Sequence, residues 1–262
     1  MTSHPLVRIG LPLLLAVGLI GYWEWAVEAF AIKPFVLSAP SAIWATFENN
    51  FSSLMASAWI TLRTTILAFA LAVIGGVALA VLFSQSPIFE RALYPYAVTL
   101  QVTPVVAIAP LINIWVGLSR ADLAVLILAL IVAFFPILSN TTTGLKSTDL
   151  NLRALFQLYG ASRWQTLVKL QLPTALPYLL AGMKISGGLA LIGTVVAEFA
   201  AGSGASQGLA WRIIEASNRL QIAKSFAALA ILSALGILIF FGLSLLEWLV
   251  LRRWHESQNE AE

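Results

Sequence analysis

Six long apolar runs, separated by shorter polar segments, account for most of this chain of 262 residues. Because an α-helix rises about 1.5 Å per residue, about 20 apolar residues are enough to cross the hydrocarbon core of a bilayer. We therefore expect an all-α integral membrane protein in which about six transmembrane helices form a single transmembrane domain over residues 1–262. The expected spans cover residues 9–30, 60–84, 93–116, 121–143, 177–199 and 225–250.

A polar segment, Leu145–Pro177, separates the fourth run from the fifth. It contains five charged side chains, each of which would cost about 2.5–3.5 kcal/mol at the centre of a bilayer. The segment therefore lies in water, although spans flank it on both sides. The charged residues are Lys146, Asp149, Arg153, Arg163 and Lys169.

Helical spacing in the first half of this segment predicts an amphipathic helix. Leu152, Leu155, Phe156 and Tyr159 fall on one face of such a helix and form an apolar stripe. The helix could lie on the membrane surface or bind a partner protein, and these residues alone leave both interpretations open.

The second half of the segment predicts a turn followed by a second short helix. Gly160 permits a sharp turn, and Ser162 can cap a helix that runs from Trp164 to Leu170. We expect Pro173 to end this helix and Pro177 to occupy the first turn of the next span.

The composition supports a membrane protein and limits the chemistry available to it. The chain is 60% hydrophobic and only 10% charged, whereas soluble domains are about 25% charged. Its net charge of +3 is too small to indicate a nucleic-acid partner, and it has no cysteine. The two histidines, His4 and His255, lie at opposite ends of the chain, so we expect no metal site and no catalytic residues.

The distribution of Lys and Arg predicts the orientation in the membrane. With the N-terminus inside, eight basic residues fall in cytoplasmic segments and five fall in outer segments. This bias places both termini and the Leu145–Pro177 segment in the cytoplasm. The first run follows Arg8 and precedes Ala29-Phe30-Ala31, as in a signal peptide, but it is long for a signal core and we interpret it as a span.

Polar side chains inside the expected spans are few, and they are therefore candidates for a translocation pathway. The alternative is that each one hydrogen-bonds a neighbouring helix. The candidates are Gln101, Thr103, Asn113, Asn140, Ser186, Thr194 and Glu198. Lys184 makes the fifth span marginal, and we expect its side chain to extend toward the nearer membrane interface. Glu198 lies near the outer end of that span, where it could gate the outer mouth or anchor a loop.

Small residues recur every four positions along the fifth span, which allows another helix to approach closely. They are Gly182, Ser186, Ala190 and Thr194. Beyond this span, residues 202–208 form a glycine-rich outer turn. Trp211, Ile214 and Leu220 then alternate with charged residues, which predicts a short amphipathic helix that rims the outer opening or lies at the membrane interface.

Several short motifs resemble those of the permease subunits of bacterial ATP-binding cassette importers. They are Gly160-Ala161-Ser162, Leu172-Pro173 with Pro177 and Gly182, and Ala197-Glu198. The branch that imports nitrate, sulfonates, taurine and pyrimidine or riboflavin-type compounds is similar over roughly residues 35 to 250. The motifs that resemble this branch are Ser38-Ala39-Pro40-Ser41, Thr103-Pro104-Val105-Val106-Ala107 and Gly160-Ala161-Ser162-Arg163-Trp164-Gln165.

This resemblance implies a non-enzymatic permease of the bacterial inner membrane that works by alternating access. It implies two ATPase subunits that hold ATP and Mg²⁺, a second copy of this chain, and a periplasmic or lipid-anchored binding protein. The chain itself lacks the Gly-x-x-x-x-Gly-Lys-Ser/Thr phosphate loop. The alternative is a channel or a secondary carrier not coupled to ATP, although such carriers usually have more spans or inverted repeats.

By the same resemblance, residues 145–176 are the cytoplasmic coupling loop that docks on the ATPase. The family commonly has an acidic residue six positions before the loop glycine, where this chain has Ala154. Docking would therefore rest on apolar side chains, helped by Arg153. The expected docking residues are Arg153, Leu155, Phe156, Leu158, Tyr159, Gly160, Ala161 and Ser162.

Overall fold

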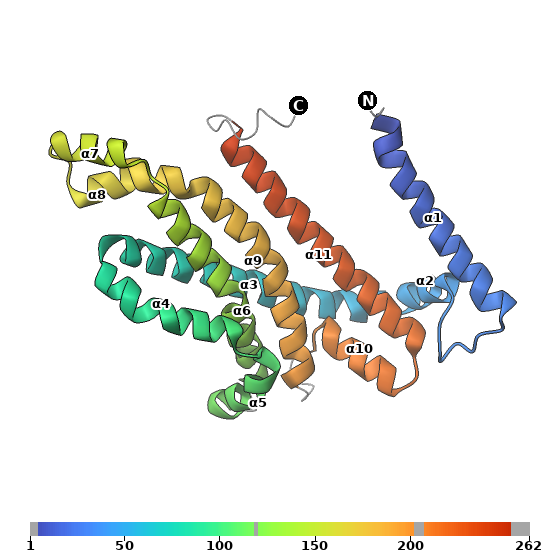
Figure 1. Ribbon diagram of the computed structural model, residues 1–262. Coiled ribbons are helices and arrows are strands. Elements are labelled where there is room, and N and C mark those ends of the chain that lie inside the picture. The colour runs from blue at the N-terminus through green and yellow to red at the C-terminus, as the bar shows by residue number, and fades with distance from the viewer. Residues whose placement is uncertain (1–4, 118–119, 202–206, 253–262) are drawn as a thin grey trace. The chain divides into compact units, whose positions relative to one another are not determined.

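The computed structural model describes residues 5–117, 120–201 and 207–252, and in this part of the chain it contains helices and no strand (Figure 1). Five helices are long and apolar enough to cross a membrane, or six if one bent pair counts as a single span. The predicted all-α class with about six transmembrane helices is therefore confirmed. His4, His255 and the first five residues of the glycine-rich turn lie outside the described residues.

The helices follow the apolar runs and add short elements between them. They are α1 (Pro5–Ala29), α2 (Pro40–Asn49), α3 (Phe51–Gln85), α4 (Pro87–Val102), α5 (Val105–Val116), α6 (Ala121–Lys146), α7 (Leu150–Leu158), α8 (Arg163–Thr166), a π-helical turn η2 (Leu167–Gln171), α9 (Leu172–Ala201), α10 (Leu209–Asn218) and α11 (Ile222–Leu251).

The chain forms two compact units. The smaller unit comprises residues 1–58 and 207–233, and the larger unit comprises residues 59–206 and 234–262. Two long helices, α3 and α11, each contribute residues to both units.

Helices α6 and α9 form the centre of the larger unit and lie side by side (Figure 1). Glycines permit this approach, because a Cβ atom on Gly182 would lie 3.0 Å from Asn140 Cβ, and one on Gly193 would lie 3.0 Å from Ala129 Cα. Ser186 and Ala190, between these glycines, are fully buried. The small residues predicted to permit close packing therefore do so within one chain.

The third apolar run does not form one straight span. Helices α4 and α5 meet at a bend of 104°, where Thr103 and Pro104 have extended backbone with ψ of 124° and 113°. Pro104 causes this break because a residue before proline is disfavoured in the helical region. Pro110 lies within the continuous helix α5.

In the smaller unit, α10 confirms the short helix predicted after the glycine-rich turn. Its buried residues are Leu209, Ala210 and Ala216, whereas the prediction placed Trp211 and Ile214 on the apolar face; both are only partly buried.

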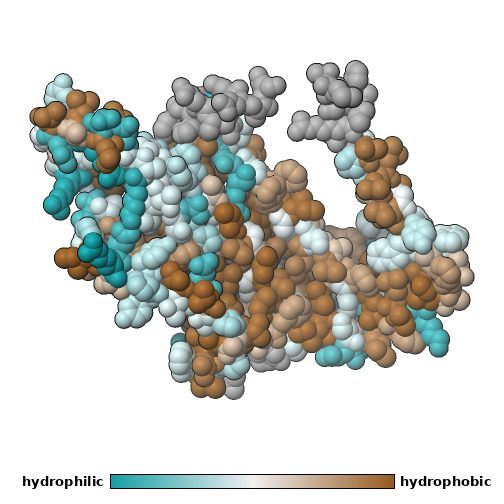
Figure 2. Space-filling view, in the orientation of Figure 1, coloured by the Kyte–Doolittle hydropathy of each residue, from teal (hydrophilic) through white to brown (hydrophobic). Residues whose placement is uncertain are grey.

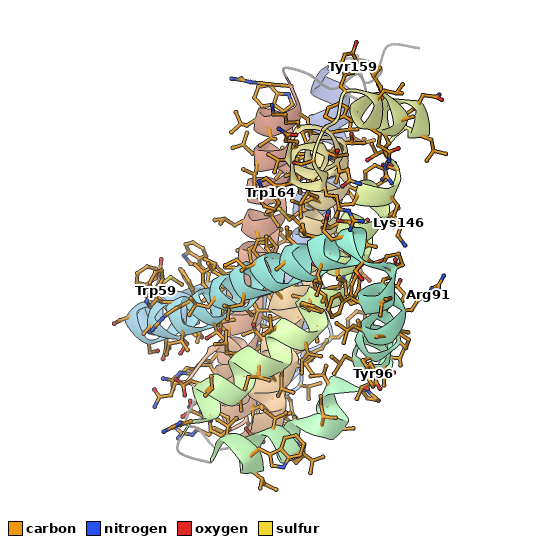
Figure 3. The ribbon with its side chains drawn as sticks, turned by 90° about the vertical axis from the view of Figure 1, so that its left-hand side faces the viewer. Trp59, Arg91, Tyr96, Lys146, Tyr159 and Trp164 are labelled. Carbon is orange, nitrogen blue, oxygen red and sulfur yellow. The ribbon has the colours of Figure 1, made fainter. Side chains whose placement is uncertain are left out.

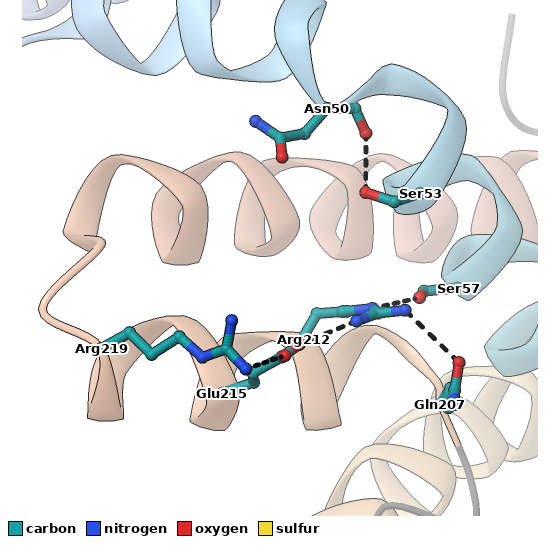
Figure 4. A network of polar contacts seen from close by, with 7 residues as sticks. All are labelled: Asn50, Ser53, Ser57, Gln207, Arg212, Glu215 and Arg219. Atoms are coloured by element: carbon teal, nitrogen blue, oxygen red, sulfur yellow. Dashed lines mark hydrogen bonds and ion pairs between the residues drawn. The ribbon is translucent and has the colours of Figure 1, made fainter.

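A network of polar contacts fixes α10 (Figure 4). Arg212 Nε donates to Ser57 Oγ at 2.9 Å, and its Nη1 lies 2.8 Å from the Glu215 carboxylate. Arg219 reaches the same carboxylate at 3.1 Å. The hydrogen bond from Arg212 is the largest effect on Glu215 and lowers its pKa. Burial opposes this shift, and the positive charges of Arg212, Arg219 and Lys224 add to it.

Candidate functional site

The polar segment between α6 and α9 folds as a helical hairpin, residues Asp149–Thr166, that projects from one end of the larger unit (Figure 1). Asp149 caps α7 by accepting hydrogen bonds from the backbone N–H groups of Asn151 at 2.6 Å and Leu152 at 3.2 Å. The predicted amphipathic helix is therefore α7, and its N-terminal orphan donors are satisfied locally.

The turn of the hairpin has the predicted chemistry. Gly160 has φ of +67°, a left-handed conformation that favours glycine. Ser162 then caps α8, because its hydroxyl accepts from Gln165 N–H at 3.2 Å and Gln165 Oε1 accepts from Ser162 N–H at 2.8 Å. This reciprocal pair is a capping box.

The prediction that Pro173 ends the second helix is wrong. The backbone stays helical from Arg163 to Ala201, and Pro173 lies directly after the π-helical turn η2. A proline ring clashes with the carbonyl four residues before it in a regular α-helix. The wider π turn, in which Leu172 N–H donates to Leu167 O, relieves this clash at Lys169. Pro177 consequently lies inside α9 rather than in its first turn.

Large apolar side chains are exposed around the tip of the hairpin. Leu158 and Tyr159 are 84% and 83% exposed, and Trp164 is 69% exposed. Figure 3 shows Tyr159 and Trp164 at this end of the unit, and Figure 2 shows hydrophilic and hydrophobic residues mixed over the hairpin. Because the hairpin's charges keep it out of the lipid core, this apolar surface is suited to binding a protein.

A cavity of about 380 Å³ lies beside the exposed tip. Its wall combines apolar and polar side chains, and four of the eight predicted docking residues line it. Its lining residues are Leu155, Phe156, Tyr159, Ala161, Gln165 and Lys169.

Two contacts hold the base of the hairpin. Arg153 Nη2 donates to the carbonyl oxygen of Leu145 at 2.6 Å, which satisfies a carbonyl at the end of α6. Lys146, the last residue of α6, forms an ion pair with Glu90 in the first turn of α4. Both contacts place a cation at a helix C-terminus, where the helix dipole favours positive charge.

Three of the predicted pathway residues are buried at the contacts of α9 with α3 and α6. Ser186 Oγ donates to Ala133 O at 2.7 Å, and Thr194 Oγ1 donates to Ala190 O at 2.9 Å. Glu198 is 2% exposed, and its carboxylate accepts from Thr61 Oγ1 at 2.9 Å. Thr194 Oγ1 also accepts from Thr65 Oγ1 of α3 at 3.2 Å. Each of the three residues thus hydrogen-bonds a neighbouring helix, and a role in a pathway stays a prediction.

The other four pathway candidates lie on α4, α5, α6 and the bend between α4 and α5. Gln101 is exposed, whereas Asn113 is buried and its Oδ1 has no hydrogen-bond partner among the described residues. Asn140 donates to Pro136 O at 2.8 Å, and Thr103 donates to Thr99 O at 2.7 Å. Their role in a pathway stays a prediction.

Lys184 pairs with an acidic residue of α11, and its extension toward the membrane interface stays a prediction. Its Nζ lies 2.8 Å from the carboxylate of Glu247 on α11 and 5.8 Å from the centre of the Phe240 ring. An ion pair inside the larger unit neutralises both charges in an apolar setting. Glu247 was not among the predicted site residues, although it is the one acidic residue within the apolar helix Ile222–Leu251.

A helical hairpin separates the membrane-length helices α6 and α9. This architecture is that of a membrane transport protein. The crystal structure of an amino acid ABC transporter with histidines has the same fold, with a TM-score of 0.62 and 17% sequence identity. The similarity covers 80% of this chain and 97% of that one.

The family is clear from the sequence comparisons. The chain belongs to the family described as binding-protein-dependent transport system inner membrane component, which matches residues 72–255. It is therefore an integral inner-membrane protein and a permease subunit of an ATP-binding cassette importer.

Curated relatives match nearly the whole chain. A formylaminopyrimidine transport permease protein of Halalkalibacterium halodurans is 34% identical over 89% of this chain and 92% of its own length. A riboflavin transport system permease protein of Chloroflexus aurantiacus is 33% identical over 95% of this chain and 91% of its own length. A putative aliphatic sulfonates transport permease protein of Bacillus subtilis is 31% identical over 94% and 87%.

Proposed function

We propose that two copies of this chain form the pathway of an importer for a small polar or aromatic solute, driven by ATP hydrolysis on two separate ATPase subunits that dock on the hairpins. The observation that carries this proposal is the hairpin itself. It presents exposed Leu158 and Tyr159 beside a cavity, on a segment whose charges hold it in water. Such a surface fits a groove on a soluble partner.

ATP and Mg²⁺ belong to the partner in this proposal. The sequence has no phosphate-binding loop. The hairpin can transmit motion because α8, η2 and α9 form one continuous helical element from the docking surface into the bundle. Docking at the hairpin and reorientation of α9 would then be parts of one mechanical step.

The proposed orientation places both termini and the hairpin in the cytoplasm, as the distribution of basic residues favours. Helix α10 then lies on the outer side, where a periplasmic or lipid-anchored binding protein would deliver the solute. The small residues of α9 are buried against α6, so a second copy would use a different surface of the chain.

The solute class rests on the relatives. The three relatives described above are named for the transport of a formylaminopyrimidine, riboflavin and aliphatic sulfonates. We propose a solute of these kinds, and the pairing of Lys184 with Glu247 argues against an anion bound by Lys184 alone.

Gly160→Asp tests the docking step. This variant should insert normally but lose ATP-dependent uptake in proteoliposomes that contain the ATPase and the binding protein. The reason is that it adds charge and a side chain at a left-handed position of the docking turn. Uptake at the wild-type rate, or uptake that a solute gradient drives without ATP, would contradict the proposal.

A further inference from the structure

A second cavity, of about 320 Å³, lies on the other side of the hairpin, facing the turn between α3 and α4. We call it the basic pocket. Ala161 borders both this pocket and the apolar cavity described above. The pocket is lined by Arg153 and Gln157 of α7, Arg163 of α8, Gln171 of η2, and Gln85 at the end of α3. Segments distant in sequence thus build one polar site next to the proposed docking surface.

The basic pocket contains two positive charges and no acidic lining residue. Among the ion pairs that the described residues form, none includes Arg153 or Arg163. The nearby acids are already engaged, since Asp149 caps α7 and Glu90 pairs with Lys146.

Arg153 is held in the pocket wall rather than free in solvent. Its Nη2 is fixed by the carbonyl of Leu145, and its buried Nε has no hydrogen-bond partner in the described part of the chain. A guanidinium held in this way is already ordered before a ligand arrives, which lowers the entropy cost of binding.

The donor set defines the ligand chemistry. Arginine binds a carboxylate through two parallel N–H···O bonds, and the amides of Gln157 and Gln171 can supply further donors at the same site. The volume of about 320 Å³ is large enough to admit a side chain. The occupant must also reach the hairpin from the cytoplasmic side, where the proposed function places the ATPase.

We propose that the basic pocket receives an aspartate or glutamate side chain of the ATPase that docks on the hairpin. This inference rests on the proposed function, and it names the chemistry by which that partner is recognised. The family resemblance places an acid on the permease, at the position of Ala154. In this chain the charges are reversed, because the permease supplies the cations and the ATPase supplies the anion.

Carbodiimide cross-linking tests for this carboxylate directly. Arg163→Lys keeps the charge and adds a primary amine, in a permease co-expressed with an ATP-binding cassette ATPase that binds the wild-type chain. The carbodiimide activates a carboxyl group, the lysine Nζ attacks the carbonyl carbon, and an amide forms as the urea leaves. We expect a cross-linked peptide that joins position 163 to an acidic residue of the ATPase. Arg91→Lys is the matched control, because Arg91 is exposed on α4 and lies outside the pocket.

Binding measurements give a second readout. Arg163→Gln should weaken the affinity for the ATPase about tenfold, the order expected for one hydrogen bond to a charged group, and should reduce its salt dependence. Arg91→Gln should change neither quantity.

The outcomes separate this inference from the proposed function. If the wild-type chain binds no ATPase, the proposed function fails. If the complex forms but position 163 gives no cross-link and Arg163→Gln binds as tightly as wild type, the inference alone is overturned. It is also overturned if Arg163→Gln loses co-purified phosphatidylglycerol while its affinity for the ATPase is unchanged, since the pocket would then hold a lipid headgroup.

Discussion

Gly144 lies at the base of the hairpin, where the last turns of α6 meet the first turns of α9. A Cβ atom there would lie 2.8 Å from Tyr178 Cβ and 2.9 Å from Ala175 Cα. Because Ala175 Cα belongs to the backbone, the clash cannot be relieved by a rotamer change, and the two helices must separate. Gly144→Ala should therefore destabilise the protein by about 1–3 kcal/mol through overpacking, offset by at most about 1 kcal/mol of helix propensity.

Gly188→Ala provides a matched control on α9. No atom lies within 4 Å of the position its Cβ would occupy, so only the gain in helix propensity, about 1 kcal/mol, remains. The two alanine variants should therefore differ by about 2 kcal/mol in the free energy of unfolding. Equilibrium unfolding in mixed detergent micelles measures this difference. A Gly144→Ala protein as stable as Gly188→Ala would refute the close contact between α6 and α9.

Three further predictions concern single contacts. Lys184→Met should destabilise the protein by about 1–3 kcal/mol because it strands the Glu247 carboxylate, and adding Glu247→Met should restore most of that loss in the same unfolding assay; an unrecovered double variant would contradict the ion pair. Ser162→Ala should cost about 1 kcal/mol of local stability by removing the capping box, seen as faster hydrogen exchange in α8, whereas Ser162→Asp should exchange like wild type. The folded-state pKa of Glu215 is lowered from its ordinary value of about 4.5, so its stabilising contribution is present above that value and is lost as pH falls through the folded pKa. Below pH 4.5, the midpoint temperature of thermal unfolding should consequently depend less on pH for Glu215→Gln than for wild type. Equal pH dependence of the two proteins would contradict the Arg212 contact.

Much of the fold depends on residues that are close together in the sequence. Spans need long apolar runs, so the positions of the transmembrane helices were predictable from the order of apolar and polar segments, except for the bend in the third run. The hairpin was predictable because its turn depends on a few adjacent residues, Gly160 and Ser162 among them. These residues act through backbone conformation and a cap, neither of which needs a distant partner.

The contacts that the sequence did not reveal depend on how helices are rotated about their axes. Lys184 and Glu247 are 63 positions apart, and nothing local indicates that their faces meet. The same holds for Thr61 and Glu198, which are 137 positions apart. The prediction for Pro173 was wrong for a different reason. A proline usually ends a helix, and no residue pattern in the sequence predicts the neighbouring π turn.

The π turn at Leu167–Gln171 also sets the rotation about the helix axis between the hairpin and α9. Successive residues of an α-helix are turned by about 100° around the axis, and a π turn accommodates one additional residue within the helix. The five residues Leu167–Gln171 therefore set how far α8 is rotated about the helix axis relative to α9. They decide the direction in which the hairpin points when it leaves the membrane, independently of the surface that α9 presents to α6. Removing the additional residue of this turn would rotate the hairpin by about 100° relative to that surface.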